Sequence, residues 1–415
     1  MLASLQDILD TVKSNTLTYQ QKLMCLGNIA ERLFDPRELL GYTDEEWQFL
    51  QNQMICDLNE GYAIYRPRYI LPDYNVYIEK GCKFLELPAP KNLDDVLDGL
   101  LILYSHVPSI TTFPVYIGRL DVLLDPFITD EEQDYIKIKR FLNHVDKTVP
   151  DSFCHANIGP YDTKAGRLIL KAVIELEAPT PNMTIRYDKS KTSREFAELA
   201  AKACLLVSKP SFANDAYYIS DLGEQYGIAS CYNALPECGG AYTLTRLRLG
   251  TIARACKTVD EMVNELLPRV SKCALSTMDK RHKFVVEESN FFNTSFLEKE
   301  GFIKRTNFTG MFAIVGLADA ANHLLQQEGL NETFGKSQRG DEIATLIMDK
   351  LKEITDNHEG VYAERTGSRY LLHAQVGASN HEEDKRNAPA HRIRVGEEPT
   401  LLAHLKQSAP FHKYF

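Results

Sequence analysis

The chain has 415 residues, of which 44% are hydrophobic and 25% charged, and its formal net charge is -10. These are the values of a globular protein, and they exclude disorder, collagen or coiled coil as the main organisation. The 47 Lys and Arg residues are spread along an acidic chain, which argues against a nucleic-acid-binding surface.

Residues 1–145 are predicted to be mainly helical. Capping boxes that begin at Thr43 and Thr129 each precede apolar residues at helical spacing. Another helix is expected over 92–106, and the proline-rich segment 63–77 is typical of an irregular or edge strand.

Short strands and longer helices alternate in the rest of the chain. Strands are expected over 183–187 and 216–219, and a helix capped by Ser193 should run to about Leu206. This alternation predicts an α/β body over 146–415, on which the helical N-terminal region, residues 1–145, is packed.

No export or membrane segment is predicted. The N-terminal apolar residues recur at helical spacing with acidic residues between them, unlike a signal peptide. The longest apolar stretch, 311–318, is far shorter than the ~20 residues that span a bilayer. We therefore expect a cytoplasmic protein that does not bind a membrane.

The cysteines do not form a metal-binding pattern. There are nine of them, an odd number, with no Cys-x-x-Cys pair, and the eleven histidines include no His-x-x-x-His pair. The sequence therefore predicts reduced thiols and no bound metal.

The most unusual segment is 227–240, which holds Cys231, Glu237 and Cys238 among three glycines. One interpretation is a surface turn with two buried structural thiols, because a free cysteine usually behaves as a small hydrophobic residue. The other is a loop that presents a reactive sulfur at a pocket, since glycines allow a tight turn and a close approach to a ligand. The residue types alone leave both open.

The run SCYNALPECGGAYTL over 230–244 resembles the cysteine loop of the YjjI family of glycyl radical enzymes. That class includes pyruvate formate-lyase and anaerobic ribonucleotide reductase. Segments 181–186, 210–215 and 308–317 are similar to other regions of the same class, so the resemblance extends over nearly the whole chain.

The resemblance implies an α/β barrel of ten strands in two half-sheets, wrapped by helices, with loop 227–240 at its centre. In this class, under anaerobic conditions, a glycyl radical takes a hydrogen atom from the cysteine, here Cys231, and the thiyl radical takes one from a small organic substrate. A dry interior protects such intermediates. A radical cysteine needs no lowered pKa, unlike a nucleophilic one.

The chain departs from the class beside its cysteine. Many dehydratases and decarboxylases have a glutamate base two residues after the cysteine, where this chain has Asn233. Glu237 is the candidate replacement for that base. Ser230 stands where pyruvate formate-lyase has the first of two cysteines, which disfavours that reaction here.

The 415 residues contain no Arg-[Val/Ile]-x-Gly-aromatic motif, which carries the radical glycine in this class. The run 394–397, Arg-Val-Gly-Glu, lacks the intervening residue and the aromatic, and is interpreted as an ordinary turn. The resemblance therefore implies a truncated barrel body without its C-terminal glycyl radical domain, with no radical glycine in this chain, inactive alone.

Several polar and aromatic side chains are expected to line the substrate pocket. His155 and Glu288 belong to polar clusters that alternatively hold solvated or capping residues. The charged segment 381–392 is a solvated loop or a docking surface. The full set of pocket candidates is Tyr232, Asn233, Cys238, Asn214, His155 and Glu288.

The resemblance also implies partners. These are a radical S-adenosylmethionine iron–sulfur activating enzyme, a separate glycyl radical domain and a small-molecule substrate; a homodimer is the default assembly. We expect Cys231 at a loop tip facing a cavity, Cys238 off the pocket wall, and an open apolar groove beside Cys231. The alternatives are a catalytically dead remnant or binding protein that keeps the barrel, and a thiol enzyme that uses Cys231 as an ionic nucleophile.

Overall fold

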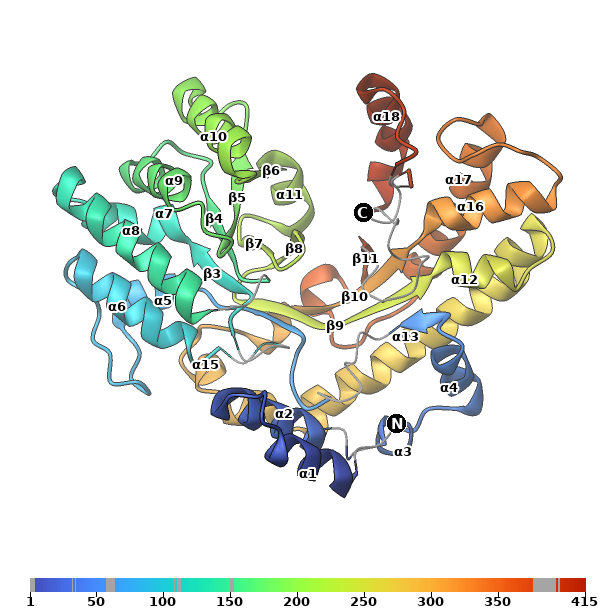
Figure 1. Ribbon diagram of the computed structural model, residues 1–415, viewed down its shortest axis with the longest axis horizontal. Helices are drawn as coiled ribbons and strands as arrows, with labels where there is room; N and C mark the ends of the chain where they lie inside the picture. Colours follow the sequence, from blue (N-terminus) through green and yellow to red (C-terminus); the bar gives the residue numbers. More distant parts are fainter. Residues whose placement is uncertain are drawn as a thin grey trace.

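The structure is a computed structural model. It describes residues 4–415 except 32, 34, 57–63, 108, 110–112, 150–152, 376–392 and 395. Two sheets and a separate two-stranded hairpin are surrounded by helices (Figure 1). The chain is therefore a mixed α/β protein, as predicted.

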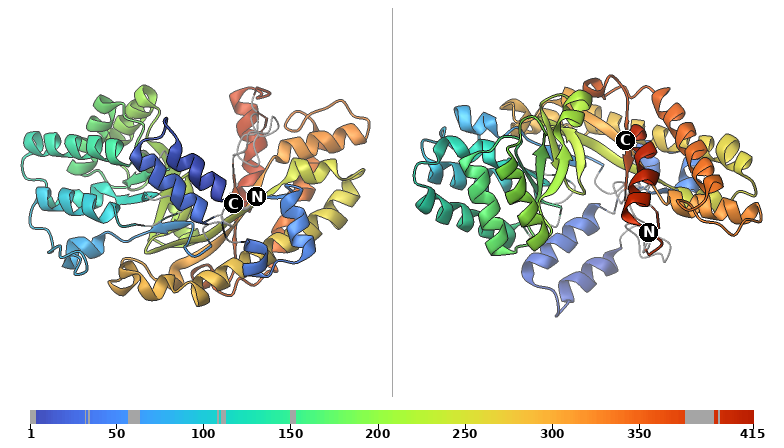
Figure 2. Two further views of the ribbon diagram at one scale, coloured as in Figure 1. Left: turned by 60° about the horizontal axis from the view of Figure 1, so that its bottom comes forward. Right: turned by 90° about the horizontal axis from the view of Figure 1, so that it is seen from above.

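Helices fill most of the first 148 residues. They are α1 (Leu5–Lys13), α2 (Tyr19–Glu31), α3 (Pro36–Leu40), α4 (Asp44–Gln51), α5 (Asn75–Lys80), α6 (Leu93–Tyr104), α7 (Leu120–Leu124) and α8 (Glu131–Thr148). Seen from above, α1 and α2 project from the body (Figure 2).

Three short strands from the same range join the sheets: β1 (Ile55–Cys56), β2 (Tyr69–Leu71) and β3 (Tyr116–Arg119). The prediction that residues 1–145 form a helical region packed on the barrel is therefore incomplete, because this region also contributes strands. Strands from this region are hydrogen-bonded into both sheets.

The first half-sheet is four-stranded and parallel, in the order β3, β4 (His155–Ile158), β5 (Asn182–Tyr187) and β6 (Ser211–Asn214). Its connections contain α8, α9 (Lys164–Leu176) and α10 (Arg194–Val207), the last with the predicted cap at Ser193. In Figure 1, these helices lie together on the outer side of the strands.

The second half-sheet is built around β9 (Gly239–Arg248), β10 (Phe308–Val315) and β11 (Leu371–Ala374), which are parallel, with β1 and β2 antiparallel to β9. Every residue of β9 and β10 is buried. Its helices include α12 (Leu249–Arg254), α13 (Leu267–Lys283), α16 (Leu317–Gln327) and α17 (Gln338–Asp356). The remaining helices are α11 (Asp215–Leu222), α14 (Phe291–Thr294), α15 (Phe296–Lys299) and α18 (Leu401–Ser408).

The cysteine segment forms an antiparallel hairpin of β7 (Tyr226–Ala229) and β8 (Asn233–Pro236), followed directly by β9. All of β7 and most of β8 are buried. The interpretation of 227–240 as a surface turn is therefore wrong, because the segment is an internal hairpin joined to a central strand.

Two local predictions are corrected by helix capping. Residues 216–219 belong to α11 and not to a strand, because the Asn214 side chain accepts a hydrogen bond from the Tyr217 N–H and starts a helix. The cap of α8 is Asp130 and not Thr129, since Asp130 accepts from the N–H groups of Glu132 and Gln133. The capping box at Thr43 is confirmed.

Gly240 lies where β9 passes close to the backbone of β2. Its φ is +147°, and a Cβ there would lie 2.0 Å from the Tyr69 carbonyl oxygen. We expect Gly240→Ala to lower the free energy of unfolding by about 3 kcal/mol, because backbone must move to admit the methyl group. Urea denaturation measures this loss. Gly27→Ala is the control: nothing lies within 4 Å of a Cβ at this position in α2, so its stability should be unchanged or slightly higher.

Candidate functional site

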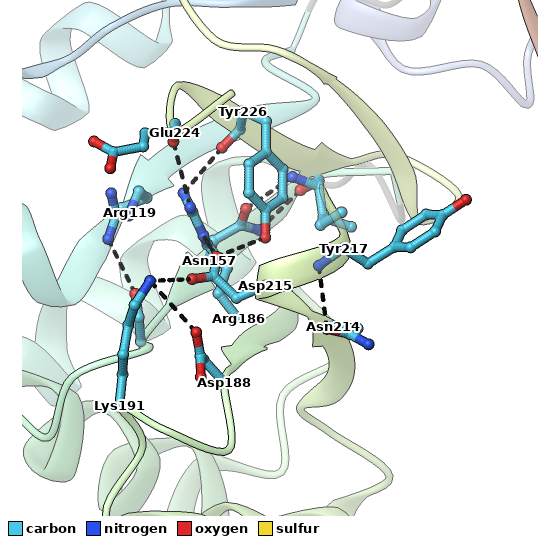
Figure 3. A network of polar contacts seen from close by, with 12 residues as sticks. Arg119, Asn157, Arg186, Asp188, Lys191, Asn214, Asp215, Tyr217, Glu224 and Tyr226 are labelled. Atoms are coloured by element: carbon cyan, nitrogen blue, oxygen red, sulfur yellow. Dashed lines mark hydrogen bonds and ion pairs between the residues drawn. The ribbon is translucent and has the colours of Figure 1, made fainter. Parts of the chain in front are cut away.

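A buried guanidinium holds the entry to the cysteine hairpin. Arg186 of β5 donates from Nη2 to the Glu224 carbonyl at 3.3 Å and from Nη1 to the Tyr226 carbonyl at 3.2 Å. Its Nε lies 2.7 Å from Asp215 Oδ1, and the two side chains are 2% and 1% exposed. The Tyr226 ring lies under the guanidinium and its hydroxyl also donates to Asp215 (Figure 3). This ion pair therefore joins β5, α11 and β7.

Asn157 of β4 bonds to the same edge of the hairpin. Its amide Nδ2 donates to the Ile228 carbonyl and its Oδ1 accepts from the Ile228 N–H, both at 2.8 Å. One side chain thus supplies both hydrogen bonds that a neighbouring strand would give. Since Asn157 and Ile228 are buried, neither backbone group has water as an alternative partner.

His155 completes this edge next to Cys231. Its Nδ1–H donates to the Ser230 carbonyl at 3.1 Å, and its Nε2 accepts from the Thr184 hydroxyl at 2.7 Å. Burial lowers the pKa of His155 to about 4, so the ring is neutral near pH 7. His155 and Asn157 are fully buried in a strand, which overturns the alternative of solvated or capping residues.

Cys231 lies at the tip of the hairpin, between two residues in the left-handed region. Ser230 has φ +53° and Tyr232 has φ +65°. Such conformations cost of order 1–3 kcal/mol each and persist where the surrounding structure imposes them. The Cys231 side chain is partly buried, Ser230 Oγ lies 3.9 Å from its sulfur, and Tyr232 is 52% exposed with its ring edge-on to His155.

Asn233 connects the hairpin to the second half-sheet. Its Oδ1 accepts from Gln375 Nε2 at 3.2 Å, and Gln375 directly follows β11, with its N–H bonded to the Ile314 carbonyl. Asn233 is fully buried, and its Nδ2 has no hydrogen-bond partner among the described residues. Asn233 therefore presents a donor whose direction is fixed by Gln375.

Glu237 lies at the other end of the hairpin. Tyr226 pairs with Pro236, whereas Cys231 is in the turn beyond the Ala229–Asn233 pair. At roughly 3.3 Å per strand residue, these ends are on the order of 10 Å apart. Glu237 accepts from Tyr116 Oη at 3.0 Å, and burial, with a smaller contribution from Asp73, raises its pKa to about 7. The structure does not bring Glu237 to Cys231.

Three other predicted pocket residues have their described contacts elsewhere. Cys238 is buried with its sulfur 3.7 Å from the Gly301 carbonyl, and burial raises the pKa of its thiol to about 11. Asn214 caps α11 and lines an open depression of about 670 Å³ beside Phe212. Glu288 is exposed at the end of the helical segment Phe284–Glu288.

The late segments named from the sequence are only partly described. Gly396 lies in a turn with φ +85°, closed by a bond from the Glu397 N–H to the Arg394 carbonyl. Segment 381–392 lies outside the described residues. Over the described residues of the chain, no cluster of three potential metal ligands occurs, and no helix is long and apolar enough to cross a membrane.

Sequence reasoning missed the residues that hold the hairpin: Arg186, Asp215 and Gln375. The available signal was Arg186 itself, a charged residue in the apolar strand over 183–187. A charge buried in a strand needs a partner, but nothing local indicates that Asp215 provides it.

The comparisons with known proteins decide the family. A family model described as "Glycyl radical enzyme YjjI-like" matches residues 17–415. The chain belongs to this family. It is 41% identical to "Uncharacterized protein YjjI" of Escherichia coli K12 over 407 residues, 97% of this chain and 77% of the other. It is 92% identical to an uncharacterized protein of Haemophilus influenzae KW20 over 415 residues, 100% of this chain and 81% of the other.

Solved structures support the same fold. An anaerobic ribonucleotide reductase from Thermotoga maritima with citrate in its active site has a TM-score of 0.73 at 13% identity, covering 98% of this chain and 88% of that one. Hydroxyproline dehydratase from Clostridioides difficile has a TM-score of 0.56 at 11% identity, covering 89% and 70%. The two half-sheets with their helices therefore have the glycyl radical enzyme barrel fold, as predicted.

The role of Asn157 in this YjjI-like chain is testable by stability. Asn157→Ala leaves the Ile228 N–H and carbonyl buried without partners, so we expect the free energy of unfolding to fall by about 2–4 kcal/mol. Urea denaturation gives the value. Asn264→Ala, at an exposed position, is the control and should change stability by less than ~0.5 kcal/mol. Equal losses in the two variants would contradict the assigned role.

Glu237 should make stability depend on pH. Its folded-state pKa, about 7, lies above the reference value of 4.5, so the stability present below pH 4.5 is lost as the pH rises through 7. Glu237→Gln keeps an acceptor for Tyr116 but does not ionise. We expect the variant to gain up to ~3 kcal/mol relative to wild type between pH 4.5 and 8 in urea denaturation. A constant difference across this range would refute the buried neutral carboxyl.

Proposed function

We propose that the protein is a radical enzyme in which Cys231 forms a thiyl radical that takes hydrogen from a small organic substrate. The observation that carries this proposal is the position of Cys231. It is at the tip of a buried hairpin, in a strained turn, held between the half-sheets of a glycyl radical enzyme barrel.

The proposed step exchanges hydrogen atoms. The class's glycyl radical supplies the unpaired electron: the Cys231 S–H bond breaks and a glycine Cα–H bond forms. The cysteine sulfur then takes a hydrogen atom from a substrate carbon, which reforms the S–H bond and leaves a substrate radical. Returning both atoms after the rearrangement regenerates the starting enzyme, so no external oxidant is consumed.

The surroundings of Cys231 favour this chemistry over an ionic thiol. Both nitrogens of the neighbouring His155 are bonded, one to the Ser230 carbonyl and the other to Thr184. A neutral imidazole in this state does not take the thiol proton, and Glu237 lies at the far end of the hairpin. A thiyl radical needs neither base.

The partners of the reaction are also proposals. A radical S-adenosylmethionine iron–sulfur enzyme would install the radical, and a small molecule would be the substrate. Residues 1–415 contain no Arg-[Val/Ile]-x-Gly-aromatic motif, so the radical glycine would come from outside them. We further propose a cytoplasmic, anaerobic enzyme, with a homodimer as the default assembly.

A deuterium experiment tests the role of Cys231 without a known substrate. Thiol hydrogens exchange with water, whereas a glycine Cα–H does not. Reversible transfer between the radical glycine and Cys231 therefore replaces the glycine hydrogen by deuterium in D₂O. We expect the electron paramagnetic resonance doublet of the activated protein, supplied with a radical domain, to collapse to a singlet. Cys231→Ala should retain the doublet.

Two controls make this result specific. The doublet of Cys238→Ala should collapse to a singlet as in wild type, because Cys238 is bonded to the Gly301 carbonyl away from the tip. A polypeptide of residues 1–415 alone, with the activating enzyme and S-adenosylmethionine, should give no doublet. Collapse of the doublet in Cys231→Ala would refute the proposed function. A stable doublet in wild type that does not collapse in D₂O would identify a catalytically dead barrel.

A further inference from the structure

His155 holds the residues on both sides of Cys231. Its Nδ1 bonds to the Ser230 carbonyl, and its ring is edge-on to that of Tyr232, with centroids 5.0 Å apart and an interplanar angle of 85°. The Ser230 carbonyl belongs to the planar peptide group that contains the Cys231 nitrogen, so a bond to this oxygen also orients the Cys231 backbone. The orientation of one imidazole ring therefore affects both flanks of the cysteine.

Two hydroxyl groups continue from this ring across the first half-sheet. Thr184 Oγ1 of β5 lies 2.7 Å from His155 Nε2, and Ser211 Oγ of β6 lies 2.7 Å from Thr184 Oγ1. His155 and Thr184 are 0% and 1% exposed, while Ser211 is partly buried on the last strand of the half-sheet. A chain of hydrogen bonds therefore runs from the edge of the sheet to the peptide group of Cys231.

The direction of each bond in this chain is fixed. A carbonyl oxygen only accepts, so the hydrogen of the neutral His155 ring lies on Nδ1, and Nε2 is an acceptor. Thr184 then uses its one hydroxyl hydrogen for Nε2, and its oxygen accepts the hydrogen of Ser211. The other acceptor for Ser211, the Met183 carbonyl, is more distant at 3.4 Å. Turning the ring away from the hairpin would break its bonds at both nitrogens.

We propose that Thr184 and Ser211 are positioning residues for the reaction of Cys231. They act through His155: their hydroxyl groups hold its ring in the orientation in which Nδ1–H bonds to the Ser230 carbonyl, and this keeps the Cys231 sulfur where hydrogen atoms are exchanged. Neither hydroxyl gains or loses a hydrogen atom in that step. The proposal describes how the site proposed above is held, and it rests on Cys231 being the radical residue.

The turn at Cys231 needs such support. A misplacement of ~1 Å can lower the rate of a reaction about 100-fold, because the reacting atoms must be nearly in contact. The residues on either side of Cys231 have left-handed φ values, +53° and +65°, and such conformations persist only where the surrounding structure imposes them. His155 contacts both of these residues, so the hydroxyl chain that fixes its ring opposes relaxation of the turn.

The rate of the deuterium exchange measures this positioning. In the protein supplied with a radical domain, we would follow the collapse of the doublet in D₂O with time and compare its rate constant with the amount of radical formed. Thr184→Val replaces the hydroxyl by a methyl group and should slow the collapse tenfold or more without lowering the radical yield. Thr184→Ser should recover most of that rate. Ser211→Ala should have a smaller effect, because the Thr184 hydroxyl still bonds to His155.

Thr277→Val is the matched control. Thr277 is also a buried threonine, 3% exposed, and its hydroxyl bonds to a carbonyl within α13. Both valine variants should unfold at a lower urea concentration than wild type, but only Thr184→Val should slow the collapse. Equal collapse rates in the two variants would show that Thr184 is merely structural, and the proposal would be wrong even if Cys231→Ala confirms the reactive sulfur.

NMR of protein labelled at its histidine nitrogens tests the chain without any radical. The His155 resonances, identified by their loss in His155→Asn, should show a hydrogen on Nδ1 and none on Nε2. Thr184→Val should shift the Nε2 resonance because its hydrogen bond is lost, whereas Thr277→Val should leave it in place. A hydrogen on Nε2 in wild type would overturn the proposed chain and leave the function of Cys231 untouched.

Discussion

A hairpin buried inside a barrel must have its outer backbone groups satisfied, and the site depends on how this chain meets that constraint. The backbone groups on the edge of an exposed two-stranded hairpin bond to water. The corresponding groups of this buried hairpin need other partners. Every second carbonyl from Glu224 to Ser230 instead accepts a hydrogen bond from a side chain of the first half-sheet. The donors are Arg186, Asn157 and His155, which lie on adjacent parallel strands. These bonds fix the position of Cys231 relative to the first half-sheet.

This arrangement explains where charge is placed along the hairpin. The carboxylates lie at its base, where Asp215 is neutralised by Arg186 and Glu237 is largely protonated below pH 7 because burial raises its pKa to about 7. At the tip, His155 is neutral and Asn233 is an amide. A buried carboxylate beside Cys231 would need its own cation, and removing either partner of such a pair typically costs several kcal/mol. The tip avoids that requirement.

The sequence was sufficient for the family and the fold, and insufficient for the geometry around Cys231. The strand over 183–187 and the cap at Ser193 are local features, so they were predicted correctly. The strand over 216–219 was wrong because the Asn214 cap outweighed the β propensity of Tyr217 and Tyr218. Glu237 was proposed as a base from its short separation along the chain, but in a hairpin that separation becomes distance along a strand. The pairing of Asn157 with Ile228 joins residues 71 apart, which no local pattern reveals.

The proposed hydrogen-atom transfer would make different demands on the site from proton transfer. When a proton and an electron move together, no net charge develops on the sulfur, so preorganised dipoles gain little there. Distance and direction matter instead, because the reacting atoms must be held in near contact. Strain at Ser230 and Tyr232 and the rigid bonds from His155 and Gln375 supply fixed position. A tip that supplies fixed position therefore suits the proposed radical step, which is electrically neutral at the sulfur.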